Sequence, residues 1–168
     1  MEQSEEWADR IDEALAFNFG SQRIERPKDM GRQRRGFDRI LHMRNNSVIT
    51  IDLKKRNPKY VEHYDKDIAV ETGHEFATGL KEGWVWKVEC QFILYYWTDV
   101  DSSGKRILLP IAYQNDMANF RPWFERVCLE YETPSTYGSK SKSGNWVTFN
   151  AFVPVADIPS KCLIRLIL

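Results

Sequence analysis

Three ionisable residues in the middle of the chain have the types and the spacing to act on a phosphate group. Asp52 and Lys54 are separated by one residue, and thirteen residues lie between Asp38 and Asp52. Side chains two positions apart on a β-strand point to the same face, so Asp52 and Lys54 are expected to project together. Two carboxylates and an ammonium that converge are suited to bind a divalent cation and to polarise a phosphate.

The segment that must position these groups, residues 37–55, reads as two short strands joined by a tight turn. Asn45 and Asn46 indicate the turn, because asparagine tolerates a positive φ angle. The second strand is expected to be buried because it contains the β-branched residues Val48, Ile49 and Ile51. A buried carboxylate is costly unless it is paired or bound to metal, which favours a function for Asp52. Asp38 joins the other two groups only if the turn sets the matching register.

Positive charge is concentrated around these residues, although the chain as a whole has a formal net charge of zero. Residues 21–60 contain twelve Lys and Arg but only four Asp and Glu. Clustered cations beside carboxylates are typical of phosphate-binding surfaces, and a solvated basic face is the alternative interpretation. A later Ser- and Gly-rich loop adds two lysines that could approach phosphate or belong to a plain linker. The cations expected to bind nucleic acid are Arg32, Arg34, Arg35, Arg39, Lys55, Arg56, Lys140 and Lys142.

The rest of the pattern predicts an α/β fold, with α+β as the alternative, built on a central mixed β-sheet flanked by helices. Hydrophobic spacing predicts helices at residues 4–17 and within 115–132, with Pro122 in the first turn of the second helix. Strands are expected at residues 68–71, 83–97, 106–111 and 146–155, with a hairpin turn at 99–104. Residues 21–36 are expected to form a basic connection. One domain is expected over 1–168, with its core at about 4–132 and a C-terminal strand and tail at 145–168.

Further candidate groups are few. The strand at 68–71 ends in Glu71, the best candidate for another acidic site residue. His63 and His74 lie nearby and are expected to be surface residues rather than ligands or bases. The three cysteines are far apart and form no CxxC pair, which argues against a disulfide framework and a thiolate zinc site. No apolar run approaches a membrane span and the N-terminus is acidic, so a soluble cytoplasmic protein without a membrane partner is expected.

The spacing of Asp38 and Asp52-Leu53-Lys54 resembles the signature of the PD-(D/E)XK nuclease superfamily, in which one acid opens a strand and a D/E-x-K triplet lies on the next. Phe37 stands where the proline of the motif's name would stand, a commonly relaxed position. The stretches AVETGHEF and EGWVWKVECQFILYYW are similar to small phage and bacterial members, so the resemblance covers roughly residues 37–111. It implies a restriction-endonuclease-like core and a bacterial or phage-infected host cell.

The resemblance also implies roles for the residues. Asp38 and Asp52 would hold Mg²⁺, for which Mn²⁺ can substitute, and an acid of the preceding helix, Glu13 or the neighbouring Asp12, would join them. Lys54 would orient water or stabilise charge on the phosphate, and Glu71 would act as a further ligand or as a general base.

The expected function is metal-dependent hydrolysis of phosphodiester bonds in DNA, with RNA as an open alternative substrate. A second interpretation is a nuclease-like fold without catalysis that binds nucleic acid or a protein partner, for example as a phage-encoded inhibitor. The zero net charge favours a protein partner mildly, because strong non-specific DNA binding requires excess positive charge. The spacing leaves open whether the chain acts alone, as a homodimer or in a larger assembly.

Overall fold

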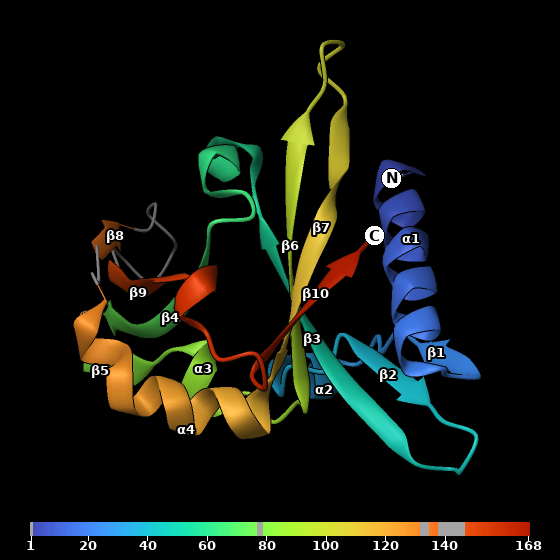
Figure 1. Ribbon diagram of the computed structural model, residues 1–168, viewed down its shortest axis with the longest axis horizontal. Helices are drawn as coiled ribbons and strands as arrows, with labels where there is room; N and C mark the ends of the chain where they lie inside the picture. The colour runs from blue at the N-terminus through green and yellow to red at the C-terminus, as the bar shows by residue number, and fades with distance from the viewer. Residues whose placement is uncertain (1, 77–78, 132–134, 138–146) are drawn as a thin grey trace.

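A large mixed β-sheet forms the centre of the computed structural model, which describes residues 2–76, 79–131, 135–137 and 147–168. Within these residues its strand order is β1–β2–β3–β6–β7–β10 (Figure 1). The strands are β1 (Arg23–Glu25), β2 (Arg39–His42), β3 (Val48–Arg56), β6 (Phe92–Val100), β7 (Arg106–Asp116) and β10 (Leu163–Ile167). β3 and β6 are parallel, whereas every other neighbouring pair of this sheet is antiparallel.

A second, smaller sheet packs against one face of the large one. Its strand order within the described residues is β5–β4–β9–β8, and its neighbouring strands are antiparallel. The strands are β4 (Asp67–Phe76), β5 (Gly79–Glu82), β8 (Ser135–Tyr137) and β9 (Val147–Pro154). Figure 1 shows this sheet to the left of the large sheet, with the longest helix, α1, on the opposite side.

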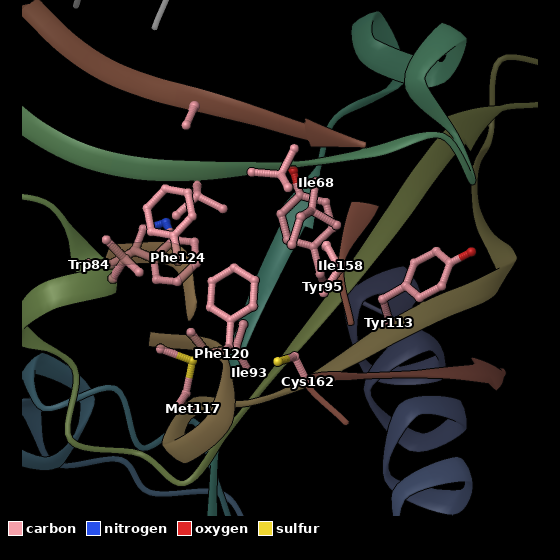
Figure 2. Packing of buried hydrophobic residues seen from close by; sticks show 14 of the residues in the cluster. Ile68, Trp84, Ile93, Tyr95, Tyr113, Met117, Phe120, Phe124, Ile158 and Cys162 are labelled. Atoms are coloured by element: carbon pink, nitrogen blue, oxygen red, sulfur yellow. The ribbon is translucent and has the colours of Figure 1, made fainter. Parts of the chain in front are cut away.

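The buried side chains form two clusters, one on each face of the large sheet, and the helices help to cover both. The helices are α1 (Glu2–Phe19), α2 (Met30–Arg34), α3 (Trp84–Lys87) and α4 (Met117–Val127), with short 3₁₀ turns at Pro58–His63, Cys128–Glu130 and Val155–Asp157. Ile11 and Leu15 of α1 pack with Ile51 and Leu94 on one face. On the other face the small sheet, α3 and α4 enclose a larger aromatic cluster around Phe120, Phe124 and Tyr95 (Figure 2).

Strand alternation in β3 decides which side chains meet which cluster. Ile51 and Leu53 contact the α1 cluster. Because side chains alternate, Asp52, Lys54 and Arg56 point to the opposite face, toward the small sheet. The charged residues of β3 therefore lie between the two sheets, where α3 and β4 can supply further groups.

The mixed α/β architecture with a central mixed sheet is confirmed, and the hairpin turn at 99–104 joins β6 to β7 as expected. Four local predictions need correction. Residues 84–87 form helix α3 rather than part of a strand, and residues 21–36 contain β1 and α2. Pro122 lies in the middle of α4, because Asp116 accepts a hydrogen bond from the Ala118 N–H and starts the helix earlier. The tail contains strand β10. No helix in the described part of the chain is long and apolar enough to cross a membrane.

Candidate functional site

The hairpin of β2 and β3 brings two carboxylates together. Arg39 pairs with Ile51, so one further step of the antiparallel register places Asp38 opposite Asp52. The Asp38 N–H donates to the Ile51 carbonyl at 3.0 Å, and the Leu53 N–H donates to Asp38 Oδ2 at 3.0 Å. Residues directly opposite in an antiparallel pair present their side chains to the same face. The turn at Asn45–Asn46, where Asn46 has φ of 61°, therefore sets the register that the site requires.

Asp52 is held in an unfavourable environment for a carboxylate. Asp52 is only 4% exposed, and burial, together with the neighbouring Asp38, raises its pKa from the ordinary 3.8 to about 6. Lys54 opposes this shift, because its Nζ lies 2.6 Å from Asp52 Oδ2. The contact is an ion pair without the alignment of a hydrogen bond. The carboxylates of Asp38 and Asp52 carry like charges with little access to water, so a positive charge nearby stabilises them. Lys54 offsets their repulsion only in part, because the Asp52 pKa remains raised.

Glu71 reaches the same region from the small sheet, at an irregularity of β4. Glu71 pairs with Asn150 and Gly73 with Phe149, so Thr72 is an extra residue that forms a β-bulge. Glu71 Oε1 accepts a hydrogen bond from the Trp84 N–H at 3.1 Å and lies 2.9 Å from His74 Nε2. The carboxylate of Glu71 is therefore tied both to the start of α3 and to its own strand.

Gly83 explains why α3 can approach β4 so closely. A Cβ atom at Gly83 would lie 2.1 Å from the Glu71 carbonyl oxygen, which is far inside van der Waals contact. The absence of a side chain lets the Gly83 N–H donate to the Thr72 carbonyl at 3.1 Å. Residues 83–84 thus join α3 to the bulge, and the Gly-Trp pair of the sequence has a direct structural reason.

These elements surround one pocket of about 350 Å³ between the two sheets. Asp52 and Lys54 enter it from β3, and Glu71 enters it from β4. The Lys54 Nζ lies 5.5 Å from the centre of the Trp84 ring, which forms another wall. Two exposed cations, Arg34 of α2 and Lys87 of α3, also line the pocket. Neither makes an ion pair within the described residues, so both are available to an anionic ligand.

Gly36 shapes the approach from the basic segment. It adopts φ of 80°, and a Cβ there would lie 3.0 Å from Val88 Cγ1 and 3.5 Å from Asp52 Cβ. A glycine is therefore required for the chain to pass over Asp52 in this conformation. This passage carries α2 and its Arg34 to the wall of the pocket.

The predicted helix acid is placed elsewhere. Glu13 is exposed on α1, which covers the face of the large sheet opposite to Asp52, so it does not join Asp38 and Asp52. Asp12 is no substitute, because it pairs with Arg26 at 2.6 Å and with Arg39 at 2.5 Å. Arg39 is itself only 8% exposed and belongs to this buried network on the α1 face. The structure therefore gives no support to Glu13 as a ligand or to Arg39 as a phosphate-binding residue.

The other predicted cations are divided between surface and core. Arg32 pairs with Glu25 at 2.7 Å, and Arg35 pairs with Glu89 at 2.6 Å, both on the surface. Lys55 is exposed on the α1 side of β3, away from the pocket. Arg56 is 6% exposed and packs within the core. Lys140 and Lys142 lie outside the described residues. Of the predicted set, Arg34 alone is placed in the pocket among the residues described.

Lys87, Trp84 and His74 belong to the site but were not expected there. Trp84 and Lys87 fall in a segment whose aromatic content predicts a strand. The segment instead forms one turn of helix, which places both residues at the pocket. His74 lies three residues from Glu71, a spacing that puts side chains on opposite faces of a regular strand. The bulge at Thr72 reverses this, and bulges carry no clear sequence signal except a nearby glycine such as Gly73.

The side chains at the site fit a divalent cation only in part. Among the described residues, no group of three or more His, Cys, Asp or Glu side chains is arranged to hold a metal ion. The Asp38–Asp52 pair nevertheless has the right chemistry, since a hard cation takes carboxylate oxygens and would offset the repulsion that raises the Asp52 pKa. Comparison of the chain with protein family models, curated proteins and solved structures found no match. The pocket therefore has to be interpreted from its own chemistry.

Proposed function

We propose that this protein hydrolyses phosphodiester bonds in DNA with the help of a divalent cation, in the manner of the small PD-(D/E)XK nucleases that its motif resembles. The observation that carries the proposal is the pocket itself. Asp52 and Lys54 from one sheet and Glu71 from the other line the same cavity, and Asp38 lies opposite Asp52. Glu71, which is not part of the motif, thus meets the motif residues from a different sheet.

Each residue has a role that its position supports. Asp38 and Asp52 would hold Mg²⁺, for which Mn²⁺ can substitute. Such a cation, when bound, polarises the phosphodiester and lowers the pKa of water. Lys54 presents its ammonium beside Asp52, where it can stabilise negative charge that develops on the phosphate. Glu71 stands on the opposite wall, where it can accept a proton from attacking water.

Two further cations line the pocket, and neither has an ion pair among the residues that the structure describes. Arg34 and Lys87 come from different helices and line the same cavity as Asp52. Phosphate contacts of this kind orient a nucleic acid without reading its sequence. We infer that they hold the backbone of the substrate on either side of the bond that is cut.

A second candidate is a nuclease-like fold that binds nucleic acid or a protein without cutting. The observation that favours it is the 2.6 Å ion pair between Lys54 and Asp52. This contact partly neutralises the carboxylate and can be purely structural, as many such pairs are. The two candidates differ in whether the pair opens to admit a cation.

A nuclease assay separates the candidates. Purified protein is incubated with supercoiled plasmid, linear duplex, single-stranded DNA and RNA, each with Mg²⁺, Mn²⁺ or EDTA. Asp52→Asn removes the charge but keeps the shape of the side chain, and Asp157→Asn is the matched control at an exposed position. We expect cation-dependent cutting by the wild type and the control, and its loss in Asp52→Asn.

The outcomes have distinct meanings. Binding to DNA that weakens with salt, without cutting under any cation, supports the second candidate. Cutting that survives in Asp52→Asn would show that another part of the molecule is responsible. If the wild type neither cuts nor binds nucleic acid, the first candidate is overturned, and only a protein partner remains for the second.

A further inference from the structure

His74 lies beside the pocket without lining it, and it is bonded on both sides. Its Nε2 is 2.9 Å from Glu71 Oε1, and its Nδ1 is 3.1 Å from Thr148 Oγ1 on β9. A carboxylate accepts hydrogen bonds, so the Nε2 atom must carry the proton in this contact. The side chain of His74 is 18% exposed, which limits its freedom to leave the arrangement.

The β-bulge at Thr72 is what makes this contact possible. In a regular strand, Glu71 and His74 would point to opposite faces, because they are three residues apart. One extra residue between them restores the same face. A bulge interrupts the hydrogen bonding of a strand. The bulge of β4 lies at the position where it brings His74 to Glu71.

One carboxylate oxygen of Glu71 is held by neighbouring groups, and the other has no hydrogen-bond donor among the described residues. Oε1 receives the Trp84 N–H at 3.1 Å and the His74 ring. No described residue donates a hydrogen bond to Oε2. A carboxylate with one oxygen anchored twice has a single orientation, and its second oxygen remains available to the pocket.

We propose that His74 is a positioning residue: it anchors Glu71 Oε1 so that Oε2 faces the pocket in the orientation needed to accept a proton. This inference rests on the proposed function and adds a residue to it. His74 does not touch the substrate. Its effect is on the rate of the chemical step, whereas Arg34 and Lys87, which line the pocket, bind the substrate in the proposed function.

The test compares three substitutions of His74 in the full-length chain. His74→Phe keeps the bulk of the ring and removes the donor, and His74→Ala is the second variant in case the first fails to fold. His74→Gln restores an amide N–H near the Nε2 position. His63→Ala is the matched control, because His63 is also paired with a carboxylate, Asp67, but away from the pocket. Folding of each variant is followed by urea denaturation.

Loss of a partner that orients a metal-binding side chain lowers activity about 10- to 100-fold, and a similar range is expected for the partner of Glu71. We expect that loss in the kcat of His74→Phe and His74→Ala with KM unchanged, at least partial recovery in His74→Gln, and no change in His63→Ala. Folded variants with wild-type kcat would overturn the inference and leave the proposed function intact. Equal loss in His74→Gln and His74→Ala would also overturn it, since only bulk would then matter. A wild type that does not cut overturns both.

Discussion

Two charged clusters lie on the same face of strand β3, a few residues apart, and among the described residues the first of them lines a pocket with α2 and α3. The first contains Lys54 with Asp52 and Glu71. The second contains Arg56 with Asp67 and His63, where the Arg56 Nη2 lies 3.8 Å from Asp67 Oδ1 and His63 Nδ1 lies 2.6 Å from Asp67 Oδ2. Each has a cation from β3 and a carboxylate from β4, and a histidine beside that carboxylate. By residue type alone the two clusters are nearly equivalent.

Enclosure distinguishes them. The guanidinium of Arg56 lies 4.6 Å from the centre of the Tyr60 ring and 5.1 Å from that of Phe152, and it donates to the Tyr95 hydroxyl at 2.8 Å. The side chain of Arg56 is 7% exposed, whereas that of Lys54 is 27% exposed. Aromatic rings therefore cover the Arg56 cation, whereas Lys54 faces a pocket that residues of α2 and α3 line. A cation covered in this way serves stability, and one that faces a pocket is free for chemistry.

The largest difference between the clusters is expected in catalysis. Lys54→Met removes the ammonium that faces the developing phosphate charge, and the loss of one such group lowers kcat by about 10²- to 10³-fold. Arg56→Met is expected to leave the kcat of the folded protein near that of the wild type. Both are measured as cleavage of linear DNA with Mg²⁺, per folded molecule. Equal losses in the two variants would show that the pocket has no special role.

Stability is expected to depend more on Arg56 than on Lys54. Removing one partner from a buried ion pair costs about 3 to 5 kcal/mol, because the remaining charge stays buried. We expect Arg56→Met to lower the free energy of unfolding by that amount. Lys54→Met is expected to lower it by less, since Lys54 is itself partly exposed and Asp52, whose pKa is already raised to about 6, readily takes up a proton when the ammonium is gone. Urea denaturation of both variants tests this, and a greater loss in Lys54→Met would contradict the assignment of Arg56 to a structural role.

The pH dependence of stability sharpens the picture of Asp52. Its pKa is raised from 3.8 to about 6 in the folded protein, so the folded state keeps its proton more tightly than the unfolded state. As pH rises through this window, the wild type loses stability relative to Asp52→Asn, by about 2 to 3 kcal/mol in total. The free energies of unfolding of the two proteins should converge below the window and diverge above it, with the variant more stable. A difference that stays constant with pH would mean that Asp52 titrates normally.

The sequence was sufficient to place the hairpin but not the pocket. The asparagine turn and the β-branched residues of β3 are local signals, and the register they imply brings Asp38 opposite Asp52. The class of fold followed for the same reason, since alternation and helical spacing are local patterns. Glu71 was expected because an acid at the end of an apolar stretch is unusual.

The missing parts depend on contacts between distant segments. Lys87 was overlooked because α3 is a single turn held by Gly83 against the bulge of β4, within a stretch whose composition favours a strand. The sequence predicts that Arg56 binds nucleic acid, because a sequence shows the charge of the side chain but not the three aromatic rings that cover it. The resemblance implies a site acid on the first helix, near Glu13, but helical spacing does not tell which face of the sheet that helix covers.

The smallest expected effect concerns the two cations at the rim of the pocket. Arg34→Ala and Lys87→Ala should each raise KM a few-fold and reduce the salt dependence of DNA binding by about one unit of slope, with kcat unchanged, as loss of one phosphate contact predicts. Lys59→Ala is the matched control, because Lys59 is exposed beside the Arg56 cluster, 4.7 Å from the Tyr60 ring. Binding is measured by fluorescence anisotropy across a range of salt concentrations. If Lys59→Ala changes the slope as much as the other two, phosphate contacts extend over both clusters, and enclosure alone does not define where DNA binds.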